Sequence, residues 1–203
     1  MKTRALLGAA ALTLTASFAS AGVTFSDVLA FETDAAPAHL TGFEGLALGG
    51  PVTSIDLGGG LVGAVTTNAV ENRIEDETDG HGAVAHAGER FWKIRGNTTT
   101  VDFGGARLDA FGFWYSDKES ATIMVRFDNG DAFELTERNS GRTTFFGYAA
   151  GESGSFGSVS FEWERGNHDG LGLDGLSASL VPTPGAAALL LPGVALVGAR
   201  RRR

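Results

Sequence analysis

Oxygen-bearing side chains stand at both ends of the central part of the sequence. Glu44 lies near its start, and Asn167, Asp169 and Asp174 lie near its end. If the first and last strands of a β-sandwich lie side by side, these four residues come together. Calcium takes oxygen ligands at about 2.3–2.6 Å, so carboxylates, an amide and backbone carbonyls could form a Ca²⁺ site here. The alternative is that Asp169 and Asp174 only cap glycine turns.

Two further patterns suggest metals less well. The acidic run over 75–80 lacks the residue spacing of an EF-hand calcium loop, which favours a solvated charged loop. His81 and His86 stand five residues apart, a spacing that fits no helical zinc pair, and the chain has no cysteine to assist them. Neither pattern therefore predicts a metal site.

A pair of carboxylates raises the question of sugar hydrolysis. Glu162 and Glu164 flank Trp163 in an alternating stretch, so they face the same side of a strand. Their separation of roughly 7 Å lies within the range that glycosidases use. Acidic residues that alternate with buried aromatic residues are also ordinary strand surface, and we favour that interpretation.

Adjacent aromatic residues are the best candidates for contacting a ligand. Phe91-Trp92 and Trp114-Tyr115 place neighbouring rings on opposite faces of a strand, so one ring of each pair is expected to leave the core. An exposed ring could stack on a sugar. The candidate ligand-binding residues are therefore Trp92, Trp114 and Tyr115. The alternative, which we favour, is that these rings fill the face of the other sheet or lie under a loop.

The elements that must position these residues are predicted to be strands. Thirty glycines separate short apolar runs, and no amphipathic helical period occurs between residues 43 and 180. The clearest hairpin joins 121–127 to 132–136 through Asn129-Gly130, a pair typical of type I′ turns. The sequence thus predicts an all-β fold with one domain over 22–181, a two-sheet antiparallel β-sandwich that is jelly-roll-like. Further strands are expected at 40–46, 52–56, 61–67, 90–95, 99–103, 108–115, 156–163 and 171–176.

The charge of this domain restricts its partners. Six of the sixteen Lys and Arg residues lie outside 22–181, whereas all twenty-four Asp and Glu residues lie inside it, so the domain carries a net charge of −14. Such a surface repels nucleic acid and anionic lipid, which leaves neutral glycans, divalent cations or basic proteins. We expect no nucleic-acid partner.

The first residues have the pattern of a secretory signal peptide. Within residues 1–21, Lys2 and Arg4 precede an apolar stretch, and Ala19 and Ala21 form an A-x-A cleavage site. Cleavage there would leave Gly22 as the new N-terminus. The sequence therefore predicts an exported protein.

The last residues, 182–203, consist of three parts. A Pro-x-Pro box is followed by the uncharged run 186–199, and four arginines then end the chain. The run would reach about 21 Å as a helix, which is short for a hydrocarbon core of about 30 Å. Flanking basic residues favour the cytoplasmic side of a membrane, so a short transmembrane helix is predicted. The motif residues are Val181, Pro182, Thr183, Pro184, Gly185, Arg200, Arg201, Arg202 and Arg203.

This order of box, apolar segment and arginine cluster resembles the PEP-CTERM sorting signal. Thr183 departs from it, because the commonest form of the box has Glu there. The resemblance implies an exosortase-like partner enzyme that processes the tail. It also implies transient anchoring in the inner membrane, followed by a cell-surface or extracellular location.

The body resembles, more loosely, the β-sandwich domains found ahead of such tails. The matching stretches are 43–46, 111–113 and 169–176. Carbohydrate-binding jelly rolls share the plan of an acidic residue on the first strand and an Asp on the last.

Together these observations predict a non-enzymatic surface or matrix protein with a structural or adhesive role, directed at extracellular polysaccharide. A calcium-dependent carbohydrate-binding module is the alternative, and a secreted hydrolase is the third candidate.

Overall fold

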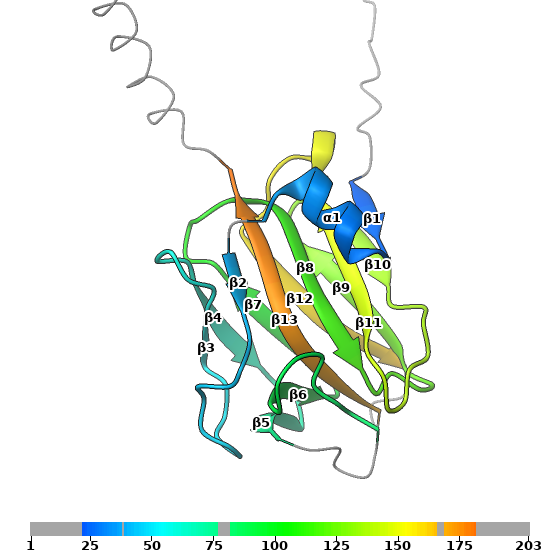
Figure 1. Ribbon diagram of the computed structural model, residues 1–203. Coiled ribbons are helices and arrows are strands. Elements are labelled where there is room, and N and C mark those ends of the chain that lie inside the picture. Colours follow the sequence, from blue (N-terminus) through cyan, green and yellow to red (C-terminus); the bar gives the residue numbers. More distant parts are fainter. Residues whose placement is uncertain (1–21, 38, 77–81, 166–168, 182–203) are drawn as a thin grey trace, which may run out of the picture.

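The structure is a computed structural model that describes residues 22–37, 39–76, 82–165 and 169–181. Two antiparallel β-sheets face each other, and one short helix lies on the outer side of one sheet (Figure 1). The elements are β1 (Val23–Phe25), α1 (Val28–Ala35), β2 (His39–Thr41), β3 (Ser54–Asp56), β4 (Val62–Thr67), β5 (Glu71–Glu75), β6 (Phe91–Arg95), β7 (Thr98–Asp102), β8 (Leu108–Ser116), β9 (Thr122–Phe127), β10 (Ala132–Glu134), β11 (Thr144–Ala149), the 3₁₀ turn η1 (Gly151–Ser153), β12 (Ser158–Arg165) and β13 (Gly170–Leu180).

The strand order confirms a two-sheet antiparallel sandwich. Sheet A has the order β1-β11-β8-β13-β6-β5, and β2 also pairs with β13. Sheet B has the order β10-β9-β12-β7-β4-β3. β2, which overlaps the first expected strand, is the antiparallel neighbour of β13, with Thr41 opposite Leu176. β1, which the sequence did not predict, precedes it and pairs with β11.

The predicted hairpin forms, but its turn differs from the expected type. β9 and β10 pair with Ala132 opposite Arg126. Gly130 has a φ of 100°, whereas Asn129 is not among the residues with positive φ, which a type I′ turn would require. Asn129 instead uses its side-chain amide to donate to the Tyr148 hydroxyl and to the carbonyl of Gly154, both at 2.8 Å.

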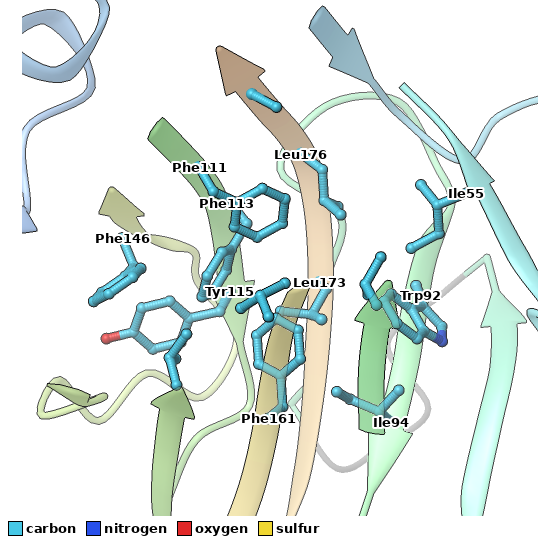
Figure 2. Close-up of a cluster of buried hydrophobic side chains, with 14 of the residues drawn as sticks. Ile55, Trp92, Ile94, Phe111, Phe113, Tyr115, Phe146, Phe161, Leu173 and Leu176 are labelled. Carbon is cyan, nitrogen blue, oxygen red and sulfur yellow. The ribbon is translucent and has the colours of Figure 1, made fainter. Parts of the chain in front are cut away.

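The main core lies between the two sheets. Alternating residues of β8 and β13 point inward and meet the inner faces of β9 and β12. Figure 2 shows part of this cluster, including Phe113, Phe161 and Leu173. The Phe113 and Phe161 rings contact edge to face across the sheets, with centroids 5.2 Å apart.

A second, smaller cluster lies on the outer face of sheet A, where α1 packs. Asp27 caps the helix by accepting the amide of Ala30 at 2.8 Å, and the helix ends at Ala36 in the left-handed region. Phe31 is fully buried because Gly112 and Gly147 leave room for its ring. A Cβ at Gly147 would lie 2.7 Å from Phe31 Cδ2.

The predicted terminal segments lie outside the described residues. These are the signal peptide with Ala19 and Ala21, and the sorting tail after Val181. Val181 itself is exposed, and its amide donates to the carbonyl of Arg107 at 3.0 Å. Over the described ranges, no helix combines the length and the apolar character needed to span a bilayer.

Candidate functional site

A groove of about 380 Å³ lies on the outer face of sheet A, beside α1. Its floor comes from β8, β11 and β13, and its walls come from α1, from β2 with the turn that follows it, and from the segment 87–88. The described residues that line it are Val28, Glu32, Leu40, Thr41, Gly42, Glu44, Ala87, Gly88, Trp114, Phe145, Asp174, Gly175 and Ser177. Three predicted site residues, Glu44, Trp114 and Asp174, therefore line one groove.

A β-bulge in β13 shapes the floor. Asp174 lies opposite Trp114 and Ser177 lies opposite Gly112, so β13 has one residue more than β8 in this interval. Gly175 absorbs the extra residue with a φ of 54°, and a Cβ there would lie 3.0 Å from Trp114 Cδ1. At this point β13 also changes its other neighbour from β6 to β2.

Two carboxylates hold the segment 82–90 against the sheet. Asp174, which is 3% exposed, accepts the amides of His86 at 2.8 Å and Ala87 at 2.9 Å through Oδ2. Glu44 Oε1 accepts the amides of Glu89 at 2.9 Å and Arg90 at 2.8 Å. The Arg90 and Glu89 amides lower the pKa of Glu44 despite a smaller opposing effect of desolvation. Glu44 is therefore a hydrogen-bond acceptor at neutral pH.

Trp114 is half-buried between two other rings. His86 stacks on it with centroids 3.6 Å apart and an interplanar angle of 4°, and Phe145 contacts it edge to face at 5.3 Å. His86 Nδ1 is also within hydrogen-bond distance of the Thr143 hydroxyl, at 3.1 Å. Desolvation lowers the pKa of His86, and the nearby charge of Asp174 opposes this shift. The ring that covers Trp114 is therefore neutral at pH 7.

The residues predicted to share a calcium cage are not all brought together: Glu44 and Asp174 line the groove, whereas Asp169 does not. Asp169 accepts the amides of Glu119, Ser120 and Ala121, each at 2.9 Å, so it caps a different loop. Within the described ranges, no three or more His, Cys, Asp or Glu side chains are grouped so that they could hold a metal ion. Asn167 and His81 lie outside these ranges.

Trp92 and Tyr115 are core residues, which corrects the prediction that they contact a ligand. Trp92 is fully buried and donates through Nε1 to Asn72 Oδ1 at 2.7 Å. Tyr115 is 3% exposed, and burial raises its pKa to about 12. Both appear among the buried side chains of Figure 2. Phe91 is buried as well, although it faces away from Trp92, because Ala83 packs over the part of the outer face of sheet A beside Gly172.

Glu162 and Glu164 form ion pairs on the outer face of sheet B. Arg126 donates to Glu162 at 2.6 Å and to Glu164 at 2.8 Å. These ion pairs place both carboxylates on the exposed face of β12, beside β9.

Sequence reasoning did not identify the other walls of the groove. α1 has only eight residues, and its weak apolar pattern gave no signal. The contribution of Gly42 and Gly88 depends on contacts between segments that are distant in sequence. The one hint in the sequence was the break in the alternation of leucines at Gly175, between Leu173 and Leu176.

Comparisons with known proteins give distant likenesses. No family model matches the chain, and the search of curated proteins finds no significant match. Among solved structures, the C-terminal family 22 carbohydrate-binding module of Clostridium thermocellum Xyn10B is 9% identical, with a TM-score of 0.42, over 74% of this chain and 98% of that chain. The K2 cleaved adhesin domain of Lys-gingipain is 14% identical, with a TM-score of 0.42, over 70% of this chain and 97% of that chain.

A third structure is the enzymatically active domain of tailspike protein 4 of bacteriophage CBA120. It is 10% identical, with a TM-score of 0.36, over 59% of this chain, and this chain covers only 19% of that one. All three TM-scores are below 0.5, and by their names the three proteins act differently. A fold does not determine a function, so the comparisons do not decide what this chain binds.

Proposed function

We propose that the domain binds a neutral saccharide in the groove on sheet A. The observation that carries the proposal is the convergence of Trp114, Glu44 and Asp174, which come from three separate parts of the chain, on one groove. An aromatic ring beside fixed acceptors suits a ligand that has apolar C–H faces and hydroxyl donors.

The charge of the groove selects the class of ligand. Glu32, Glu44 and Asp174 line it, and none of its described lining residues is Lys, Arg or His. An anionic polymer would be repelled, whereas the hydroxyl groups of a neutral sugar can donate to carboxylate oxygens. Glu44 uses Oε1 for two backbone amides, which leaves Oε2 to accept from a ligand.

Backbone amides fix these acceptors before any ligand arrives. Preorganised groups lose little conformational entropy on binding, which favours affinity. The same amides favour a binding role over hydrolysis, because they keep the pKa of Glu44 low and so make it a poor proton donor. We therefore propose a binding protein and not an enzyme.

A glycan array probed with the multimerised 22–181 domain tests the proposal. All described strands and both apolar clusters lie within this range, so the domain contains its own core. Multimers are needed because a small groove binds weakly and linked sites raise the effective concentration. We expect signal on neutral glycans and none on charged ones.

Two glycine variants give a matched comparison. Gly42 lines the groove, and a Cβ there would meet only Asp174 Oδ1, at 3.7 Å, so Gly42→Phe fills the groove without a clash at Cβ. Gly45 lies outside the groove lining, and a Cβ there has nothing within 4 Å, so Gly45→Phe is the control. Binding should be lost in Gly42→Phe and retained in Gly45→Phe. A blank array, or equal binding by both variants, would rule out this site.

We further propose that the chain is exported and sorted at the cell surface by an exosortase-like enzyme. The motifs at 1–21 and 181–203 support this, because they occur together at opposite ends of one chain. Changing all four residues Arg200–Arg203 to Ala should alter sorting while the domain stays folded. Cell fractionation and the mass of the mature protein test this. If both the localisation and the mass stay the same in the variant, the sorting role is contradicted.

A further inference from the structure

Asp131, which precedes β10, accepts several hydrogen bonds at the start of the described chain. Its Oδ2 accepts the Tyr148 hydroxyl at 2.6 Å and the backbone amide of Gly22 at 3.1 Å. The hydroxyl of Ser153 also donates to this carboxylate. Desolvation raises the pKa of Asp131, but the bonds from Tyr148, Gly22 and Ser153 together outweigh it and lower the pKa. The group is thus an anion at neutral pH.

All three of these donors are neutral. Among the ion pairs that the structure describes, none includes Asp131. The site therefore holds a partly buried negative charge beside the nitrogen of Gly22 without a described cation. A positive charge on that nitrogen would complete an ion pair at 3.1 Å.

The surroundings of this nitrogen accept only glycine. A Cβ at Gly22 would lie 2.3 Å from Tyr148 Cε2 and 2.7 Å from the carbonyl oxygen of Ala149. Tyr148 cannot easily move aside, because it is fully buried and stacks on Phe127 with centroids 4.0 Å apart. Its hydroxyl also accepts the side-chain amide of Asn129 at 2.8 Å. The Gly22 nitrogen is therefore held in a built site.

We propose that Asp131 and Tyr148 form an acceptor site for a free α-ammonium group on Gly22, created by cleavage of the Ala21–Gly22 peptide bond. The inference rests on the proposed export of the chain. The A-x-A pattern before Gly22 and the anionic site around its nitrogen identify the same bond independently.

Cleavage would change the interaction from neutral to charge-assisted. In the uncleaved chain, Gly22 offers one amide proton, whereas hydrolysis leaves an ammonium with three protons and a positive charge. Charge-assisted hydrogen bonds are roughly twice as strong as neutral ones. Because β1 pairs with β11 directly after Gly22, removal of the leader would fasten β1 to the edge of sheet A. Maturation would thus stabilise the exported fold.

The test compares the 22–181 domain in two forms. One form begins at a free Gly22, and the other carries Ser20-Ala21 ahead of it, each with and without Asp131→Asn. We expect the free form to melt at a higher temperature and the difference to vanish in Asp131→Asn. In the folded free form, the α-amino pKa should rise above its usual 7.7–8.0 by about one unit, a tenfold shift that NMR can measure.

The pH dependence gives a signature that a merely structural contact lacks. A raised α-amino pKa contributes stability below its unfolded value, and this stability is lost as the pH rises through the folded value. The lowered pKa of Asp131 sets the lower end of the pH range in which this ion pair stabilises the fold. The contribution of Asp131 is lost as the pH falls through its folded-state pKa. The other titratable group with a described contact in this site is Tyr148, whose pKa is raised by desolvation and then by Asp131.

Glu134→Gln is the matched control, since Glu134 is an exposed carboxylate on β10. It should leave the difference between the two forms intact. Equal melting of both forms, an α-amino pKa at its usual value, or a difference that survives in Asp131→Asn would each overturn the proposal. If Asp131→Asn does not fold, the α-amino pKa of the unsubstituted domain still decides. Glycan binding is measured at a separate groove. Failure of the glycan-binding proposal can therefore be distinguished from failure of the ammonium site at Asp131.

Discussion

Carboxylates in this domain act mainly as acceptors for loop backbone. Asp169 holds three consecutive amides, and Asp174 holds two amides of the segment 82–90 as well as that of Gly175. The interpretation of these residues as caps was open from the sequence alone. What could not be predicted is the identity of the amides they cap, since His86 is eighty-eight residues from Asp174.

The first prediction concerns Asp174. The Asn side chain in Asp174→Asn has only one oxygen. If its NH₂ group replaces Oδ2, it faces the amides of His86 and Ala87, and if it replaces Oδ1, the bond from the Gly175 amide is lost. An unsatisfied buried group costs about 1–3 kcal/mol, so we expect a loss of stability in that range. Urea unfolding measures it, with Asp102→Asn as the control, because Asp102 is exposed and accepts one amide. Equal losses in the two variants would contradict the role of Asp174.

The second prediction concerns the stack of His86 on Trp114. Because burial lowers the pKa of His86, the ring should protonate only below its usual pKa of 6.5. In that range the unfolded chain binds the proton more readily, so the stability that comes from the neutral ring is lost as the pH falls. Protonation beside the indole should also change its fluorescence, with a midpoint below pH 6.5.

His86→Ala provides the control for this step. The variant should lose the fluorescence step and make Trp114 more accessible to a quencher such as acrylamide. Trp92 is fully buried, so it contributes little to the change in quenching. A pH step of the same size in His86→Ala would show that another group is responsible.

Among the secondary-structure elements, the sequence predicts the long strands well. It predicts poorly the two segments that pack on the outer face of sheet A, which are α1 and 82–90. The strands at 108–115, 156–163 and 121–127 match β8, β12 and β9 closely, because alternation is a local signal. The segment 82–90 has no such period, and it is held in place by Glu44 and Asp174, which are distant in sequence. For this reason Phe91 and Trp92 are both buried, although alternation places them on opposite faces of the strand and one of them was expected to leave the core.

The third prediction concerns α1 as a wall of the groove. Phe31→Ala removes the ring that fills the space above Gly112 and Gly147, and truncation of a buried Phe typically costs about 3–5 kcal/mol. Glycan binding should weaken as well, since Val28 and Glu32 line the groove. Leu29→Ala is the control on the same helix. Leu29 is 68% exposed, so its change should stay within about 0.5 kcal/mol.

For the molecule as a whole, composition and alternation were enough to predict an all-β, two-sheet sandwich. They could not predict which face carries the groove. That depends on where α1, the turn after β2 and the segment 87–88 pack on sheet A, which contacts between distant parts of the chain decide. Trp92 faces the core between the sheets, whereas Trp114 faces the outer side of sheet A and is half-buried there.

The last prediction follows from the net charge of −14 carried by residues 22–181. Repulsion between exposed charges is screened within about 10 Å at 0.1 M salt and reaches further at lower ionic strength. Binding to a neutral polysaccharide should therefore be nearly independent of salt, because no net charge on the ligand interacts with the domain. An acidic polysaccharide of the same backbone should not bind at low salt and should gain at most weak binding as salt screens the repulsion. Affinity electrophoresis in gels that contain either polymer, run at two ionic strengths, measures both effects. Retention that is strongest in the acidic polymer at low salt would mean that a local cationic surface, and not the acidic groove, makes the contact.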